Sequence, residues 1–311
     1  MVLLGFCVCF SAFGAGGREG GLTWRQDGTE TTVTGVNGRT EEISIPLTRD
    51  GSPVTAVEKD AFKNKGLTRV SLPEGVISIG DSAFRDNALT SVSLPVGLER
   101  IGAGAFYGNQ LTSLVIPKGV AVIEGFTFQN NRLVSVELSD EITRIGEFAF
   151  SNNQLTGTLS LPQNLVGIAT FAFSKNQLTG ALEIPASVTE IGAFTFADNQ
   201  LSNIAFPAGL AEIPAGVCNG NRLTSVTIPE STMVIGEQAF AFNQLTAVVI
   251  PDRVREIKKS AFGDNQISSI AIGNDVTLHR TSFDNGFTAF YNSNGKKAGV
   301  YDLVNGNWSM Q

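Results

Sequence analysis

The chain has 311 residues, with 22 Lys and Arg against 29 Asp and Glu, which gives a formal net charge of −7. An acidic chain without a block of Lys and Arg argues against nucleic acid as a partner, because proteins hold nucleic acid by neutralising its phosphates. One His and three Cys leave little material for metal binding or acid–base chemistry, so the composition disfavours an enzyme and predicts no cofactor.

Residues 1–15 form an apolar run that ends in small residues. The run is too short to cross about 30 Å of hydrocarbon as a helix, but it has the length of the core of a secretory signal. We therefore expect residues 1–15 to be a signal peptide and the mature protein to be periplasmic, at the cell surface or secreted. Lipid attachment at Cys7 or Cys9 and an ordinary buried N-terminus are the alternatives. We expect no membrane span elsewhere, and cleavage would leave only Cys218, without a disulfide partner.

Residues 22–62 are predicted to form an N-terminal cap and the first coil of a repeated structure. Runs rich in Thr and Val are separated by Asp27-Gly28 and by Asn37-Gly38, dipeptides that favour tight hairpin turns. The segment from Ile43 to Pro46 already matches the strand pattern of the repeats that follow. We therefore expect a β-hairpin here that leads into the repeats.

Residues 63–285 repeat with a period of 22–23 residues, which lies within the range of leucine-rich repeats. Asn occurs three positions after most members of a Phe column, and a Pro column keeps the same phase. Three columns in phase over ten copies establish one repeat domain without a linker. The aromatic column, which contains one Cys, consists of Phe62, Phe84, Phe106, Phe128, Phe150, Phe173, Phe196, Cys218, Phe240, Phe262 and Phe283.

Residues 89–110 show why each column is needed. Leu89 to Leu94 has the L-x-x-L-x-L form of a short strand, in which Val92 and Leu94 point to one face. Pro95 ends the strand, and Asn109 can satisfy backbone groups in a turn that stacking would bury. Each unit is therefore one coil of a solenoid that buries its apolar side against its neighbours. Parallel strands about 4.8 Å apart predict a rod on the order of 50 Å long.

The Phe column is expected to form the core, because stacked rings inside a solenoid are commoner than a lined channel. At Cys218 the smaller side chain leaves either a void or a space that Phe206 fills. Four central coils carry a second Phe two positions before the first, which we expect to thicken the core and which could also frame a cleft. These residues are Phe126, Phe148, Phe171 and Phe194.

Residues 286–311 break the period and contain two Asn-Gly pairs, Asn294-Gly295 and Asn305-Gly306. A solenoid must cover its apolar ends. We therefore predict a C-terminal β-hairpin cap over residues 286–311.

The pattern L-x-x-V-x-L-P-x-x-L-x-x-I-G-x-x-A-F-x-x-N resembles the BspA-like, or Treponema pallidum-type, bacterial leucine-rich repeats over roughly residues 40–285. The resemblance implies a mainly β and irregular solenoid with 22–23-residue coils, a parallel sheet on its concave face and β-hairpin caps. Several members are secreted or surface proteins implicated in adhesion, so it also implies a non-enzymatic interaction protein. This chain departs from the family in carrying Asn where many members carry Cys before the next strand.

The strand register predicts where a ligand would bind. Outward positions of the L-x-x-L-x-L strands form a face of small, weakly polar residues, which a partner can approach with little cost of desolvation. Two coils insert one residue, and Gly157 and Gly180 suit β-bulges there. The alternatives are that small residues only relieve crowding and that the insertions are merely tolerated. The candidate binding residues beside the bulges are Val115, Glu137, Thr158, Ser160 and Glu183.

Two functions fit these features. The first is an exported adhesin-like or scaffold protein that binds a protein or glycan, on host matrix or another cell surface, through its concave face. The second is a periplasmic binder of a lipid or another small apolar ligand in a pocket framed by the additional Phe residues. A closed cavity above about 300 Å³ lined by Phe126 to Phe194 would favour the second. No catalytic or metal-binding residue is expected, since His279 has no Cys or second His near it.

Overall fold

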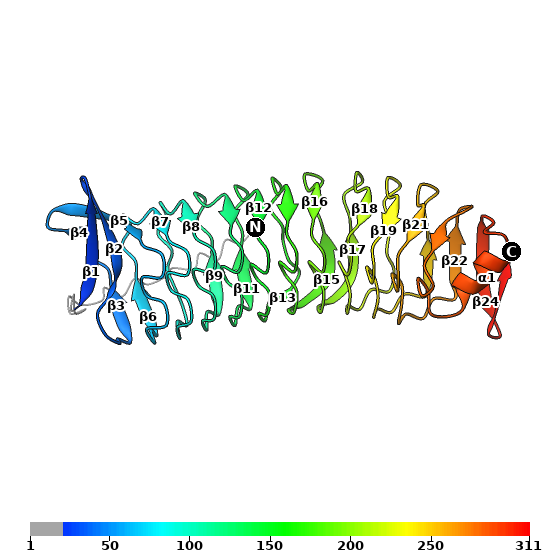
Figure 1. Ribbon diagram of the computed structural model, residues 1–311, viewed down its shortest axis with the longest axis horizontal. Coiled ribbons are helices and arrows are strands. Elements are labelled where there is room, and N and C mark those ends of the chain that lie inside the picture. The colour runs from blue at the N-terminus through cyan, green and yellow to red at the C-terminus, as the bar shows by residue number, and fades with distance from the viewer. Residues whose placement is uncertain (1–20) are drawn as a thin grey trace, which may run out of the picture.

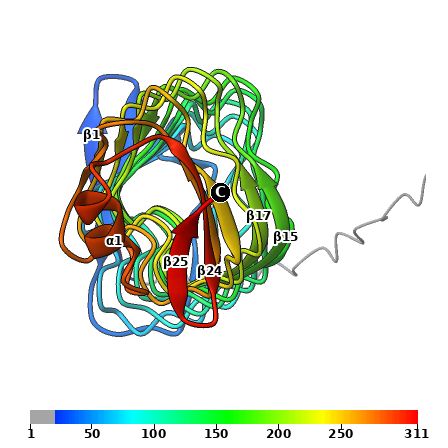
Figure 2. The ribbon, with the colours of Figure 1, turned by 90° about the vertical axis from the view of Figure 1, so that its right-hand side faces the viewer.

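The computed structural model describes residues 21–311 as a rod of about 11 stacked turns (Figure 1). Parallel strands, coils of about 22 residues and little helix confirm the predicted leucine-rich repeat fold class. Viewed along its axis, the rod shows the coils superposed as an oval ring (Figure 2). The predicted signal peptide, with Cys7 and Cys9, lies outside the described residues. Within residues 21–311, no helix is both long and apolar enough to cross a membrane.

Each coil contributes to a first strand row at its L-x-x-L-x-L segment. In β9, Leu114 is buried while Ser113 and Val115 are exposed, as the alternation predicts. Residues 91–94 occupy the same place in their coil but form no strand, and Val92 and Leu94 are only half-buried. The first strand row comprises β3 (Glu42–Ser44), β6 (Arg69–Ser71), β9 (Ser113–Val115), β11 (Ser135–Glu137), β13 (Thr156–Gly157), β15 (Gln177–Glu183), β17 (Gln200–Ala205), β20 (Ala247–Val249) and β22 (Ser269–Ile272).

A second strand row, which the sequence did not predict as strands, lies on the opposite side of each coil (Figure 1). Most of its members are two residues long, with an outward residue followed by an inward Ile, and neighbours pair in parallel. The second strand row comprises β5 (Ser52–Val57), β7 (Ser78–Ile79), β8 (Arg100–Ile101), β10 (Val122–Ile123), β12 (Arg144–Ile145), β14 (Gly167–Ile168), β16 (Glu190–Ile191), β18 (Glu212–Ile213), β19 (Val234–Ile235), β21 (Glu256–Ile257) and β23 (Thr277–Leu278).

The predicted Phe column is the core. Its rings stack along the rod with centroids 5.0–5.8 Å apart and nearly parallel planes, and all ten are buried. The stack is interrupted at Cys218, which is itself fully buried. There Phe206 packs edge-on against Phe240, with centroids 6.1 Å apart. The aromatic ring of the preceding strand therefore reaches the space that the smaller Cys leaves.

The Asn column ties each coil to its neighbours. Asn153 is buried, and its Oδ1 accepts a hydrogen bond from the backbone N–H of Leu133 in the preceding coil at 3.0 Å. Its Nδ2 donates to the carbonyl oxygens of Phe128 and Phe150 at 2.9 and 3.1 Å. The same three bonds recur at the other Asn of the column, for example Asn109. The amide thus satisfies backbone groups that the turn buries, as the sequence predicts.

Extended hairpins cover both ends. At the N-terminus, β1 (Leu22–Asp27) and β2 (Glu30–Val36) pair antiparallel, β2 runs parallel to β5, and β4 (Thr48–Arg49) pairs with β5. At the C-terminus, β24 (Gly299–Val304) pairs antiparallel with β22, and β25 (Asn307–Met310) pairs with β24. The turn between β24 and β25 is the predicted Asn305-Gly306, where both residues have positive φ.

One helix, α1 (Phe287–Ser293), was not predicted. Asn294-Gly295 ends this helix instead of forming a hairpin turn. The helix is too short to be stable by itself. It forms because Phe287 and Tyr291 are buried against Tyr301 and Trp308 over the last coil. Figure 2 shows α1, β24 and β25 lying across that end of the rod.

Candidate functional site

The five candidate binding residues lie on the outward side of the first strand row. Val115, Glu137, Thr158, Ser160 and Glu183 are all exposed. Val115 and Glu137 are register partners in the pairing of β9 with β11. Glu183 is the register partner of Ala205 at the end of β15 and β17. The structure thus places these side chains on one face, along neighbouring coils.

The inserted residues distort this face. Gly157 and Gly180 have φ of +70° and +74°, a region that favours glycine. The pairing of β15 with β17 shifts register between Gly180 and Ala181, as a bulge requires. A Cβ at Gly180 would lie only 3.0 Å from Oγ1 of Thr158. Gly180 is therefore required both by its backbone and by the close approach of Thr158.

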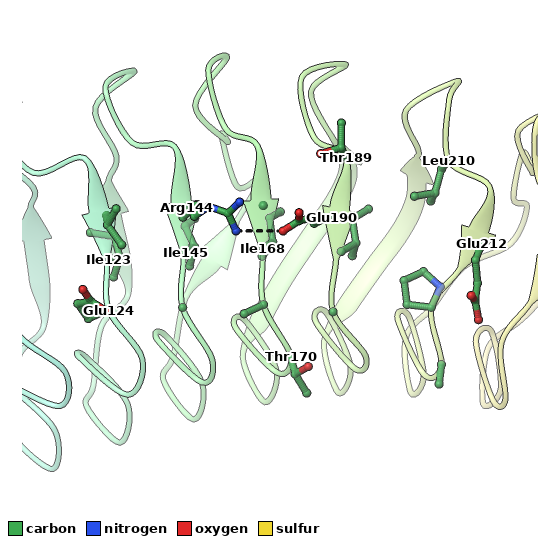
Figure 3. Close-up of a pocket in the computed structure, with 18 of the residues that line it drawn as sticks. Ile123, Glu124, Arg144, Ile145, Ile168, Thr170, Thr189, Glu190, Leu210 and Glu212 are labelled. Atoms are coloured by element: carbon green, nitrogen blue, oxygen red, sulfur yellow. Dashed lines mark hydrogen bonds and ion pairs between the residues drawn. The ribbon is translucent and has the colours of Figure 1, made fainter.

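A groove of about 790 Å³ lies over the second strand row, where the sequence predicted no site. Its floor includes the buried residues Ile123, Ile145 and Ile168, and it runs across several coils (Figure 3). Arg144 and Glu190 reach across the intervening coil to form an ion pair of 3.0 Å, which Figure 3 shows as a dashed line. The pair lies over Gly167. The groove is open to solvent.

The sequence signal for this groove is the residue that precedes the inward Ile of each strand in the second strand row. Charged residues recur at that position, for example Arg100, Arg144, Glu190, Glu212 and Glu256. Ion pairs join Arg144 to Glu190 and Lys258 to Glu212, each two coils apart. Exposed pairs of this kind contribute little to stability. The pattern was missed because two-residue strands are too short to show alternation.

The expectation that Phe126, Phe148, Phe171 and Phe194 thicken the core is wrong. They form a second stack, with centroids 4.8–5.3 Å apart, at the turn that follows the second strand row. None packs against the core cluster, Phe126 is 39% exposed and the other three are half-buried. The side chains turn outward because the backbone has positive φ at all four positions. We call this stack the Phe ladder.

The Phe ladder does not enclose a small-molecule pocket. The groove over the second strand row is lined by residues beside the Phe ladder, such as Thr170 and Gly192, but not by the four rings. This groove is therefore not the closed cavity lined by Phe126 to Phe194 that would favour a lipid or another small apolar ligand.

Cys218 and His279, the Cys and His among residues 21–311, lie outside the groove and outside the first strand row. Cys218 is in the core, where burial raises the pKa of its thiol, so that the thiol stays protonated and unreactive at neutral pH. His279 is exposed near the C-terminal end, with Nε2 2.7 Å from Oε1 of Glu256. Neither residue lines the groove or the outward side of the first strand row.

Stacked coils, a Phe core and an Asn column together define a leucine-rich repeat solenoid, a class of fold that presents extended binding faces. The chain belongs to the BspA type leucine rich repeat family: the family model, six copies long, matches residues 55–179 and again residues 167–295. Proteins of this family are generally non-enzymatic binding scaffolds. No match was found among curated proteins.

Solved structures share the fold. The pneumococcal vaccine antigen PcpA is 18% identical with a TM-score of 0.57, over 84% of this chain and 88% of that one. A leucine-rich repeat protein from Bacteroides ovatus is 21% identical with a TM-score of 0.52, over 83% of this chain and 88% of that one. A leucine-rich repeat protein from Eubacterium ventriosum is 17% identical with a TM-score of 0.50, over 85% and 92% of the two chains.

Proposed function

We propose that this protein is an exported, adhesin-like or scaffold protein that binds a macromolecular ligand, a protein or a glycan, on the outward face of the first strand row. The observation that carries the proposal is the bulged zone at Gly157 and Gly180, where the backbone departs from the regular ladder. Bulges that re-aim side chains are over-represented near functional sites. Glu137 lies one coil before this zone and Glu183 lies in the bulged strand β15, and both carboxylates are exposed.

The chemistry of the face suits a broad contact. The outward side chains around the bulges are mostly Ser, Thr and Ala, so a partner can approach the backbone closely and displace little bound water. Val115, which is 62% exposed, adds an apolar contact at one end of the zone. PcpA, which shares the fold, is a vaccine antigen. As part of the proposal, we infer that this protein is also exposed at the cell surface. A host matrix protein or another cell surface would be the partner.

The test is binding of the purified protein to immobilised matrix proteins and to epithelial cells. The double variant Glu137→Lys and Glu183→Lys should lose most of the measured binding, because it reverses both carboxylates of the zone. Its matched control is Glu141→Lys with Glu230→Lys, which changes the net charge equally at exposed positions outside the zone. Unchanged binding by the first variant, or equal loss by the control, would show that the ligand does not use this face.

Export is tested separately by adding protease to intact cells. If the protein is at the cell surface, the protease should degrade it without cell lysis. Protection until the cells are lysed would contradict surface exposure. The binding experiment with purified protein would still decide whether the first strand row is a binding face.

A further inference from the structure

Each Phe of the Phe ladder lies two positions before the core Phe of its coil, and the backbone there is left-handed. The equivalent residues of other coils, Asp60, Ser82, Gly104, Gly216, Gln238 and Ser260, also have φ between +52° and +61°. In the Phe ladder the N–H of Phe148 donates to the carbonyl of Thr170 in the next coil at 3.0 Å, which fixes this conformation. The fold therefore accepts Gly, Ser, Asp or Gln here, and an aromatic side chain is the strained choice.

Four consecutive Phe occupy this position and lie outside the core. Their rings contact one another but not the core, and their outer edges remain exposed. The Phe ladder ends at Gly216, where a Cβ would lie 2.1 Å from Cε1 of Phe194, so the last ring lies directly over this glycine. The result is a continuous apolar strip about 15 Å long, since each of its three steps is about 5 Å. Strained residues that the fold does not need indicate a function.

The negative charge of the protein is concentrated in the same coils. Residues 119–217 contain nine Asp and Glu against three Lys and Arg, so they carry −6 of the formal net charge of −7. Glu147 directly precedes Phe148, and Glu124 lines the groove two positions before Phe126. Neither carboxylate has an ion-pair partner among residues 21–311. Glu137 and Glu183 of this total lie on the first strand row, whereas Glu124 and Glu147 lie beside the Phe ladder and make it complementary to a cationic partner.

The groove over the second strand row runs beside the Phe ladder. Thr170, which Figure 3 labels, and Gly192 line it and lie one and two positions before ladder residues. Ala215 also lines it and directly precedes Gly216. A ligand in the groove can therefore contact the edges of the rings at the same time. Glu190 and Glu212 face this groove from the second strand row. Their exposed partners, Arg144 and Lys258, can be exchanged for ligand cations at small cost.

We propose that the Phe ladder and this groove form a second binding site, which takes an extended polypeptide segment with alternating apolar and basic side chains. An extended segment rises about 3.3 Å per residue, so three apolar side chains at alternate positions span about 13 Å, close to the length of the Phe ladder. The intervening side chains of the segment leave its other face. If they are Lys or Arg, their long flexible stems let the cationic ends bend back to the carboxylates of these coils. The site is separate from the first strand row and independent of the proposed function.

The test uses the purified protein and a fluorescent seven-residue peptide of alternating Lys and Leu, with binding followed by fluorescence polarisation. Two comparison peptides replace every Lys by Glu or every Leu by Ser. The first peptide should bind, and each comparison peptide should bind at least about tenfold more weakly. Equal binding of the Glu peptide would overturn the charge argument, and equal binding of the Ser peptide would overturn the role of the rings.

The variant is Phe148→Ser with Phe171→Ser, because Ser82 and Ser260 show that the fold accepts Ser at this place. It should bind the Lys–Leu peptide at least about tenfold more weakly and keep its thermal midpoint. The matched control is Phe242→Ser, a Phe with φ of +56° that is 53% exposed and lies outside the Phe ladder. The control should bind normally. Equal binding by the ladder variant, or equal loss by the control, would refute the site.

Two further measurements distinguish other occupants. Sedimentation velocity of the wild type and the ladder variant would reveal self-association through the Phe ladder. Flotation with vesicles of phosphatidylcholine and phosphatidylglycerol would reveal a lipid surface. Self-association or vesicle binding that the Phe148→Ser and Phe171→Ser variant abolishes would overturn the proposed polypeptide ligand. Their absence, together with peptide binding, would support it.

Discussion

Replacing Asn153 by Ala should lower the free energy of unfolding by about 3 kcal/mol, because it leaves backbone groups without partners. The N–H of Leu133 donates only to the Asn153 side chain, so it becomes a buried donor without an acceptor, at a cost of about 1–3 kcal/mol. The carbonyls of Phe128 and Phe150 each keep a second Asn donor, from Asn131 and Asn176, and lose only one bond of about 0.5–1.5 kcal/mol.

The assay is urea unfolding with hydrogen exchange as a local readout. The matched control is Gln154→Ala, an exposed neighbour whose change should stay within about 0.5 kcal/mol. The amide of Leu133 should exchange faster in Asn153→Ala and not in the control. A loss of stability below about 1 kcal/mol, with unchanged protection of Leu133, would refute the claim that the Asn column satisfies backbone groups.

The variant Asn153→Asp adds a pH signature. An Asp carboxylate can accept from Leu133 but faces the carbonyl oxygens of Phe128 and Phe150, so burial and repulsion should raise its pKa in the folded state. The variant should therefore be less stable than Asn153→Ala at neutral pH. As the pH falls through the raised pKa, protonation supplies a donor and the deficit relative to wild type should shrink. A deficit independent of pH would contradict this reasoning.

Two further predictions concern packing around the break in the Phe column. Burial raises the pKa of the Cys218 thiol, so iodoacetamide at pH 8 should not modify this thiol in the folded protein but should modify it in urea. Peptide mapping would measure the modification. Modification without denaturant would contradict the burial of Cys218. Gly216→Ala should destabilise the protein by more than the about 1–2 kcal/mol of a left-handed Ala, since its Cβ meets the Phe194 ring. When Phe194 is also replaced by Ser, the destabilisation caused by Gly216→Ala in thermal unfolding should be smaller by about 1 kcal/mol. If the two substitutions instead destabilise additively, the Phe194 ring does not lie over Gly216.

Sequence periodicity predicted the solenoid and its core because the same side chains return to the same place in every coil. Phe150 and Asn153 could be assigned before the structure, since a ring or an amide repeated every 22–23 residues must stack on its own copies. The Asn305-Gly306 turn was predictable for a local reason, because both residues favour the positive φ that tight hairpins need. The N-terminal hairpin turns one residue later than Asp27-Gly28, at Gly28 and Thr29, and only Gly28 has positive φ there.

Only the tertiary structure decided which way Phe148 points. Phe148 and Phe150 are two positions apart, and an extended backbone would place both on one face. The inter-coil hydrogen bond at Phe148 instead fixes a left-handed turn, which sends its ring outward while Phe150 stays in the core. The two-residue strands of the second strand row and the short helix α1 likewise depend on contacts with other coils, so no pattern within their own residues could reveal them.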